Sequence, residues 1–321
     1  MTSSEWGLLL LLSLLWGGSF FFVGVAVKEL PPLTIVCARV TIAAAILWMT
    51  APLTGLSPLR VLAHAPTLAL MGLINNAIPF VLIVSGQTRL ASGVASILNA
   101  ATPIFTVIAA HFLTRNEKLT KPRLAGALCG LMGVGLMMGA DLWRGLAADL
   151  PAELAVLGAA VSYALASLYG RRFRGLGLAP IDVATGQITA ASFILLPIAI
   201  VIDRPWGLPT PSWTAAGAVV AIAAFSTALA YIVYFRVLAG AGATNVVLVT
   251  LLAPATSILL GVLVLGERLA PRHLLGLAAI AAGLALIDGR VLRTKETRRL
   301  GPGNESGEPR ERARPPRGRT P

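Results

Sequence analysis

The feature that most constrains this chain is a series of apolar runs that recurs from one end to the other. Each run is roughly 20 residues long, which is enough to cross the hydrocarbon core of a bilayer as a helix. Only 12% of the 321 residues are charged and 56% are hydrophobic, whereas soluble domains are about one-quarter charged. Strand-like alternation is absent from the sequence, so helices must satisfy the backbone in lipid. The sequence therefore predicts an all-α polytopic membrane protein.

Turn-forming residues, mostly prolines, divide the chain into about ten predicted transmembrane helices. We expect them at 6–27, 32–50, 66–87, 91–113, 121–140, 151–170, 180–202, 212–238, 244–265 and 272–288. The first run has no preceding Lys or Arg, is too long for a signal peptide and lacks a small-residue cleavage pattern, so we expect a retained helix. Residues 290–321, rich in Arg, Pro, Gly and Glu, are predicted to form a disordered basic cytoplasmic tail.

The basic residues are distributed as topology signals. Ten of the 26 Lys and Arg lie in the last 32 residues, and most others lie in short predicted loops. With the N-terminus inside the cell, the inner loops hold nine basic residues and the outer loops six, although Lys28 after the first helix gives the opposite local signal. Both termini are therefore expected in the cytoplasm, with the chain in the cell (inner or plasma) membrane among its lipids. No recognition motif points to nucleic acid, which is not an expected partner.

The most specific structural signal is an internal repeat. Its matched landmarks are a proline, a glutamate and a glycine in each half: Pro103, Glu117 and Gly126, then Pro254, Glu267 and Gly276. The Glu-to-Gly spacing is nine residues in both halves. We therefore expect two five-helix repeats at 1–143 and 144–289. Because five is odd, the repeats must be inverted in the membrane, an arrangement typical of secondary transporters.

The chain resembles the drug/metabolite transporter superfamily, of the EamA type with ten helices. The resemblance covers residues 6–288 and is carried by the run from Leu15 to Phe20, by Arg39 and by the matched Pro…Glu…Gly segments. The first repeat departs from the family pattern at Thr114 to Glu117, where Leu-Gly-Glu is usual. The resemblance implies a central cavity between helices 1–4 and 6–9, alternating access, helices five and ten to one side, and export of small metabolites, amino acids or drug-like compounds without covalent chemistry.

Arg39 is the strongest candidate for substrate binding. It lies about eight residues into the second predicted helix, where a charge is costly unless it faces the bundle interior or a water-filled cavity. The functional hypothesis is that it binds an anionic group of the substrate, such as a carboxylate. The structural alternatives are a fixed pairing with a neighbouring helix or an extension to the membrane interface.

Neutral polar residues inside the helices are further candidates. They concentrate in predicted helices three, four, eight and nine, and comprise Asn75, Asn76, Gln87, Asn99, Thr102, Ser226, Tyr231, Tyr234 and Asn245. Such residues either hold helices together or line a path through the bundle. Their concentration in four helices favours a path.

Prolines and aromatic residues complete the set of substrate-binding candidates. Pro103 and Pro254 occupy matched places, and paired interruptions mark the binding site in repeat transporters, although each is also compatible with a simple kink. The remaining candidates are Trp16, Ser19, Phe20, Phe80 and Tyr163. For the aromatic ones, the alternative is a position facing lipid or the interface.

Two features are expected to be structural. Glu117 and Glu267 end helices four and nine, and we expect ion pairs with the neighbouring Arg115 or Arg268. Gly126, Gly130 and later glycines of helix five allow close helix packing, either within the chain or in a homodimer. The spacing does not distinguish the two.

Several functional classes find little support in the sequence. The three histidines and two cysteines have no metal-ligand or disulfide spacing, and no nucleotide motif is present, so we expect neither metal nor cofactor. No acidic residue lies near the middle of a predicted helix, which weakens proton coupling through a carboxylate and leaves exchange or facilitated diffusion open. The competing classes are a membrane-embedded enzyme acting on lipid-linked substrates, which would need an acid or histidine cluster, and a channel or scaffold.

Overall fold

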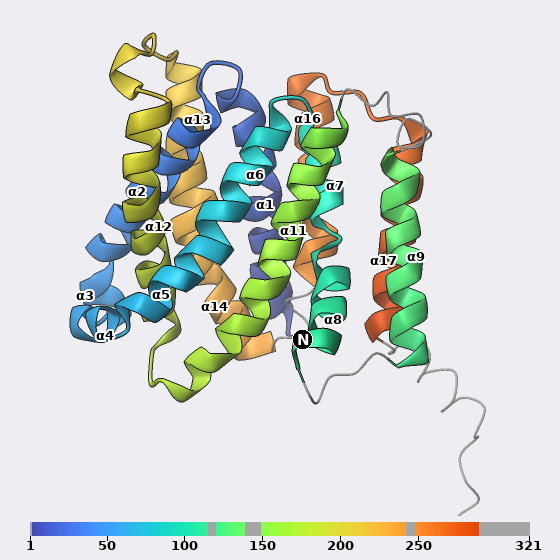
Figure 1. Ribbon diagram of the computed structural model, residues 1–321, viewed down its shortest axis with the longest axis horizontal. Coiled ribbons are helices and arrows are strands. Elements are labelled where there is room, and N and C mark those ends of the chain that lie inside the picture. The colour runs from blue at the N-terminus through green and yellow to red at the C-terminus, as the bar shows by residue number, and fades with distance from the viewer. Residues whose placement is uncertain (1, 115–119, 139–148, 242–247, 289–321) are drawn as a thin grey trace, which may run out of the picture.

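The computed structural model describes residues 2–114, 120–138, 149–241 and 248–288, and the regular structure within these ranges is helical (Figure 1). The first half contains α1 (Ser3–Ala26), α2 (Pro32–Met49), α3 (Ala51–Thr54), α4 (Pro58–Ala63), α5 (Ala65–Gly72), η1 (Leu73–Ala77), α6 (Ile78–Gln87), α7 (Ser92–Asn99), α8 (Thr102–Leu113) and α9 (Lys121–Met138). The second half contains α11 (Leu150–Gly170), η2 (Arg171–Gly175), α12 (Pro180–Ile202), η3 (Pro205–Gly207), α13 (Trp213–Ala223), η4 (Ala224–Leu229), α14 (Ala230–Ala241), α16 (Leu248–Leu265) and α17 (Pro271–Asp288).

Seven helical stretches among the described residues are long and apolar enough to cross a membrane. They are Ser3–Ala26, Pro32–Met49, Ala65–Gln87, Ser92–Leu113, Leu150–Phe173, Pro180–Ile202 and Trp213–Leu238, and the shorter apolar helices Leu252–Leu265 and Pro271–Ile287 accompany them. The chain is thus an all-α, multi-pass membrane protein, as predicted. The count of ten helices stays a prediction, and the predicted tail lies outside the described residues.

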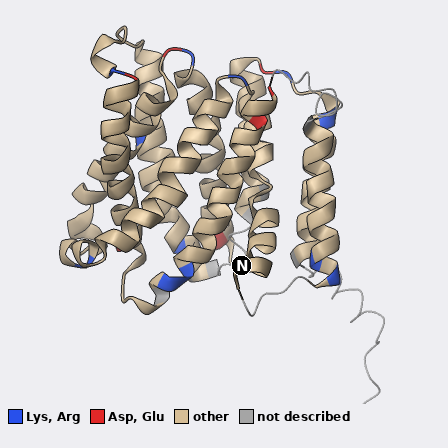
Figure 2. Ribbon diagram, viewed as in Figure 1, with Lys and Arg blue, Asp and Glu red and all other residues tan. Residues whose placement is uncertain are grey.

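Helices from the two halves of the chain pack against each other along the whole bundle. α1 lies against α16, α2 against α12, and α6 against α11 (Figure 1). A continuous apolar core joins residues of α1, α2, α6, α12 and α13, including Val40, Phe80, Ile188 and Ile222. Most of the charged residues lie near the two ends of the helices (Figure 2), whereas Arg39 is buried within α2. The core is therefore made jointly by both halves.

The helices α9 and α17 form a separate close pair at one side of the bundle (Figure 1). A Cβ atom on Gly126 would lie 2.5 Å from the carbonyl oxygen of Gly283, and one on Gly133 would lie 2.8 Å from that of Gly276. Backbones can approach this closely only where side chains are absent. Gly126 and Gly133 of α9 thus pack within the chain, and the lateral position of helices five and ten agrees with the family resemblance.

Two π-helical segments interrupt the long helices at corresponding places in the two halves. η1 separates α5 from α6 in the first half, and η4 separates α13 from α14 in the second. A π-helical turn widens the backbone and is frequent at functional sites. The sequence-based assignment treated both stretches as continuous helices.

Carboxylates fasten the two halves together at the end of the bundle that carries the α1–α2 loop. Asp203 accepts hydrogen bonds from the backbone nitrogen (2.7 Å) and hydroxyl (2.8 Å) of Thr34 near the start of α2. Glu29 likewise accepts from the backbone nitrogen and hydroxyl of Ser212, both at 2.7 Å, at the start of α13. These contacts satisfy backbone groups that a helix N-terminus leaves free.

Glu267 belongs to the same set and corrects the sequence-based expectation. Its carboxylate accepts hydrogen bonds from the backbone nitrogens of Ser92 (2.8 Å) and Gly93 (3.3 Å), at the first turn of α7. The expected ion pair with Arg268 is not formed. The positive end of a helix attracts a carboxylate, and α7 begins close enough to Glu267 to provide one. Glu117 lies outside the described residues.

Candidate functional site

Arg39 lies in the middle of the bundle, where its side chain is 6% exposed. Its Nε donates a hydrogen bond of 2.9 Å to the Thr227 hydroxyl in η4. The guanidinium carbon lies 3.7 Å from the centroid of the Phe80 ring, a cation–π contact. In the described part of the chain, no carboxylate lies within ion-pair distance of Arg39. The site therefore holds a buried positive charge that a hydroxyl and a ring stabilise and no described acid neutralises.

A network of amides and a tyrosine lies beside this charge. Asn76 donates to the Tyr231 hydroxyl at 3.0 Å, and Asn75 donates to the same hydroxyl at 3.3 Å. Asn75 also donates to the Gln187 side-chain oxygen at 3.0 Å. Tyr231 packs against the same apolar core as Phe80, the ring that contacts Arg39. The network therefore joins α12, η1 and α14 at the point where Arg39 enters from α2.

The π-helical segments position these side chains. η1 presents Asn75 and Asn76, and η4 presents Ser226 and Thr227. The wider turns leave carbonyls to be satisfied by side chains: Ser162 donates to the Ile74 carbonyl at 2.6 Å. Thr227 likewise donates to the Ile222 carbonyl, five residues back, at 3.0 Å. Polar groups from both halves are thereby brought to the same depth of the bundle.

Several buried acceptor atoms near this depth have no hydrogen-bond partner among the described residues. They are Asn76 Oδ1, Thr185 Oγ1 and Ser226 Oγ. Gln87 Oε1 in α6 and Asn99 Oδ1 in α7 are also buried without a partner among the described residues. Buried polar groups are nearly always satisfied by protein, water or ligand. Tyr163 of α11 packs against the same core. Of the candidates predicted from sequence, the structure brings together Arg39, Asn75, Asn76, Phe80, Tyr163 and Tyr231. Ser226 instead lines a small pocket beside α1, with Leu15 and Gly18.

Other predicted candidates lie in separate packing environments. The rings of Trp16 and Tyr234 pack with centroids 5.6 Å apart, in an apolar cluster of α1, α14 and α16. Ser19 and Phe20 are buried in α1. Gln87 donates to the Phe20 carbonyl at 2.8 Å. These contacts hold helices together, as the helix-packing alternative expected for polar residues such as Gln87. Trp16 and Phe20, for which a position facing lipid or the interface was the alternative, also pack between helices and not in the Arg39 site.

The residues around the paired prolines differ between the two halves. Asn99 ends α7, and its carbonyl accepts a hydrogen bond from the Thr102 hydroxyl at 2.6 Å. Pro103 stands in the first turn of α8, just after the break at residues 100–101. Pro254, by contrast, is buried inside the uninterrupted helix α16. The two prolines thus match in sequence but not in local geometry. Asn245 lies outside the described residues.

Two residues of the site, Gln187 and Thr227, were not among the candidates. Gln187 is 2% exposed and Thr227 is 1% exposed. A usable signal existed for Gln187, because it follows Pro180 by seven residues, just as Arg39 follows Pro32 by seven residues. Applying the repeat to the candidates would have identified it.

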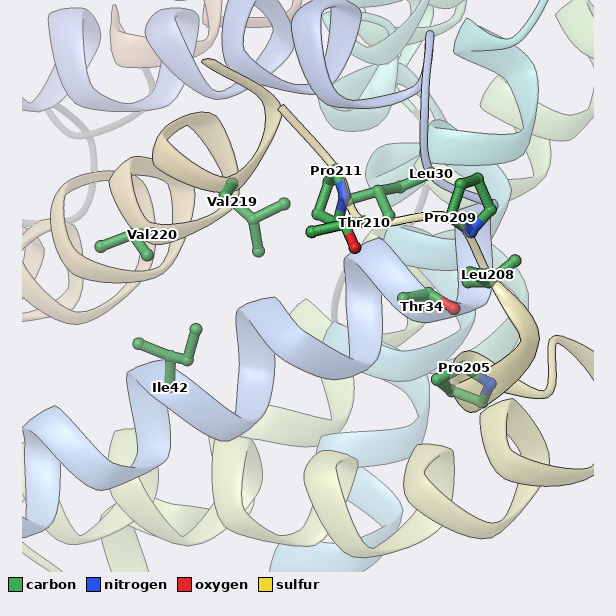
Figure 3. Close-up of a pocket in the computed structure, with 11 residues that line it drawn as sticks. Leu30, Thr34, Ile42, Pro205, Leu208, Pro209, Thr210, Pro211, Val219 and Val220 are labelled. Atoms are coloured by element: carbon green, nitrogen blue, oxygen red, sulfur yellow. The ribbon is translucent and has the colours of Figure 1, made fainter. Parts of the chain in front are cut away.

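A surface pocket of about 480 Å³ lies elsewhere, between α2, α13 and the loop before α13 (Figure 3). Leu30, Thr34, Ile42, Pro205 and Val219 are among the residues that line it. Its lining is largely apolar and includes no member of the Arg39 site. We therefore place the candidate site at Arg39 and not at this pocket.

Comparison with known proteins agrees with this arrangement of two halves. The model of the EamA-like transporter family matches residues 5–139 and again residues 150–288. The chain belongs to this family. Members of this family are transporters, so the chain is a small-molecule transporter of the multi-pass membrane class.

Named relatives of this EamA-like chain cover most of its length. It is 24% identical to the transporter YoaV of Bacillus subtilis, over 85% of this chain and 92% of that protein. It is 28% identical to the inner membrane transporter YedA of Escherichia coli, over 88% of this chain and 89% of that protein. It is 26% identical to a probable terminal-alkyne amino-acid exporter of Streptantibioticus cattleyicolor, over 91% of this chain and 95% of that protein. A solved crystal structure has the same fold, with a TM-score of 0.64 and 21% identity, over 91% of this chain and 99% of that one.

Proposed function

We propose that this protein exports small molecules that carry an anionic group, such as a carboxylate, and that Arg39 binds this group. The observation that carries the proposal is the buried, un-neutralised charge of Arg39 at the junction of the two halves. A buried cation without an acidic partner is costly, and a substrate anion would lower this cost through a charge-assisted contact.

The same placement of Arg39 supports transport by alternating access. The site draws its residues from α2, η1 and α6 in the first half and from α11, α12, η4 and α14 in the second half. Rocking of one inverted repeat against the other would expose such a site to either side of the membrane in turn. The proposed orientation has both termini in the cytoplasm. The amino-acid exporter among the relatives supports export and a carboxylate-bearing substrate.

We propose that the protein performs no covalent chemistry and uses no cofactor. An enzyme acting on lipid-linked substrates has no specific observation in its favour. Within the described residues, no group of three or more His, Cys, Asp or Glu is arranged to hold a metal ion.

The proposal is tested by counterflow in proteoliposomes with labelled amino acids and small organic acids. We expect flux of at least one carboxylate-bearing compound, loss of that flux in Arg39→Ala and partial retention in Arg39→Lys. Arg204→Ala is the matched control, because Arg204 is an exposed arginine in a loop, and it should transport at the wild-type rate. Wild-type flux in a folded Arg39→Ala variant would exclude Arg39 from substrate binding.

A further inference from the structure

Arg39 and Gln187 occupy equivalent positions in the two halves. Each stands seven residues after the proline that begins its helix, Pro32 in α2 and Pro180 in α12. Each is nearly fully buried. The repeat therefore places an arginine on one side of the central site and a glutamine at the corresponding position on the other.

Each of the two residues also makes a hydrogen bond to the π-helical segment of the other half, Arg39 as the donor and Gln187 as the acceptor. Arg39 reaches across to η4, the π-helical segment of the second half, where it bonds Thr227 at 2.9 Å. Gln187 reaches across to η1, the π-helical segment of the first half, where it bonds Asn75 at 3.0 Å. An aromatic residue also stands three positions or fewer beyond each π-helical segment, Phe80 after η1 and Tyr231 after η4. Arg39 and Gln187, each with its hydrogen bond to the π-helical segment of the other half, therefore form two corresponding arms of the site.

The arms differ in charge. Arg39 contributes a permanent cation with donors only. Gln187 contributes a neutral amide whose oxygen accepts a hydrogen bond from Asn75 and whose Nε2 is a neutral donor. A molecule held between the arms therefore meets a cation on one side and a neutral donor on the other.

We propose that Gln187 is a specificity-determining residue that restricts the transported substrate to a single anionic group at this site. This inference rests on the proposed role of Arg39 as the anion-binding residue. The group opposite the anion is a neutral acceptor, such as a carboxamide or hydroxyl oxygen, which accepts from Gln187 Nε2. A second carboxylate there would be desolvated without a cation, which costs far more than a neutral group does.

The test compares substrates that differ only by a carboxamide in place of a carboxylate: glutamine with glutamate, and succinamate with succinate. Binding to the purified full-length chain is measured by its rise in melting temperature, and flux by counterflow in proteoliposomes. We expect the wild type to prefer the carboxamide member of each pair by about tenfold or more, since an unpaired charge costs several kcal/mol and each 1.4 kcal/mol is tenfold in affinity.

Charge variants then separate specificity from structure. Gln187→Arg should reverse the preference towards glutamate and succinate, a change that a merely structural role would not produce. Gln187→Ala should weaken binding of both members without reversing the ratio. The exchange of the two side chains, Arg39→Gln with Gln187→Arg, should restore a preference for the carboxamide members that Arg39→Gln alone abolishes. Phe193→Leu is the control on the same helix, because Phe193 is 71% exposed.

The outcomes that overturn the inference are specific. A wild type that binds none of the four compounds or prefers the dianions overturns it, as does a folded Gln187→Arg variant with the wild-type ratio. A folded but inactive exchange variant shows that the two positions are not equivalent and also overturns it. If Arg39→Ala transports normally, the proposed function itself fails. If Arg39 variants lose flux while Gln187→Arg keeps the wild-type ratio, only the role of Gln187 is lost.

Discussion

The carboxylate of Glu267 caps the helix that begins at Ser92, with 2.8 Å between Glu267 Oε1 and the Ser92 backbone nitrogen. Ser92 also connects to α16 through its carbonyl, which accepts a hydrogen bond from the Ser257 hydroxyl at 3.0 Å. Each contact joins the first half of the chain to the second. Glu267, the glutamate of the second Pro…Glu…Gly segment, thus links the two halves of the chain.

Removal of this cap is expected to destabilise the fold. Glu267→Ala leaves two backbone donors without their acceptor and should cost about 1–2 kcal/mol, whereas Glu267→Gln should cost less because it retains one acceptor oxygen. Thermal unfolding in detergent measures both. Arg268→Ala is the control and should leave the melting temperature unchanged. An equal loss in Arg268→Ala would instead favour the ion pair expected from the sequence.

The close approach of α9 and α17 predicts a different response at two glycines of one helix. Gly126→Ala would place a methyl group 2.5 Å from the Gly283 carbonyl oxygen, and the helices must move apart to accept it. We expect a loss of about 1–3 kcal/mol, as for other overpacked sites. Gly135 has no atom within 4 Å of an added Cβ, so Gly135→Ala should be neutral or slightly stabilising. Apparent melting temperatures of the two variants decide the matter, and equal values would contradict the packing.

The contacts of Asp182 predict an unequal effect of removing each partner of an ion pair. Asp182 is fully buried and accepts hydrogen bonds from Arg60 Nε at 2.6 Å and from the backbone nitrogens of Ser57 and Ala179, each at 2.9 Å. Asp182→Ala should cost about 3 kcal/mol, because three donors lose their acceptor. Arg60→Ala should cost less, because two backbone donors remain and the Arg60 side chain is 44% exposed.

A double-mutant cycle on Arg60 and Asp182 supplies the check. The loss in the double variant should be close to that of Asp182→Ala alone, since Arg60 has little to bind once the carboxylate is gone. Fully additive losses would show that the two side chains do not act together.

Glu29, in the loop between α1 and α2, is expected to make a pH-dependent contribution to the stability of the fold. Hydrogen bonds from the Ser212 backbone nitrogen and hydroxyl hold the pKa of Glu29 below its ordinary value of 4.5. A carboxyl group with a lowered pKa stabilises the folded state above its unfolded pKa, and this contribution is lost as the pH falls through the folded pKa. The gain in folding stability is small because the contact between Glu29 and Ser212 is exposed.

We therefore expect Glu29→Gln to melt slightly below the wild type at neutral pH, and the difference to shrink as the pH falls below 4.5. Melting temperatures of both proteins across this range measure it. A difference that grows on acidification would contradict the contact.

The long apolar runs predicted the helices well because length and hydrophobicity alone decide whether a segment spans a bilayer. The segment expected at 32–50 is α2, Pro32–Met49, whose first residue is a proline that favours a helix start. The interruption expected at Pro103 is present as the break at residues 100–101, whereas the π-helical segments η1 and η4 were not expected. These deviations depend on contacts between helices, which hydrophobic runs do not encode.

The candidate site was predicted in part for the same reason. Polar residues such as Arg39 and Asn76 stand out because they are rare inside apolar helices. Which of them meet depends on the rotation of each helix about its axis, and this rotation separates Trp16 and Gln87 from the Arg39 site. Thr227 gave no signal, since a lone threonine is common in membrane helices.

The pairing of α9 with α17 also sets an order in which the protein assembles. α17 is the last helix of the described chain, and α9 closes the first half. During synthesis, α9 enters the membrane long before its glycine-lined partner exists, so its packing face must wait among lipids until the second half has been inserted. Contacts that join distant parts of a chain form late. The docking of α17 onto α9, a helix made far earlier, is therefore expected to be a late step in the folding of this transporter.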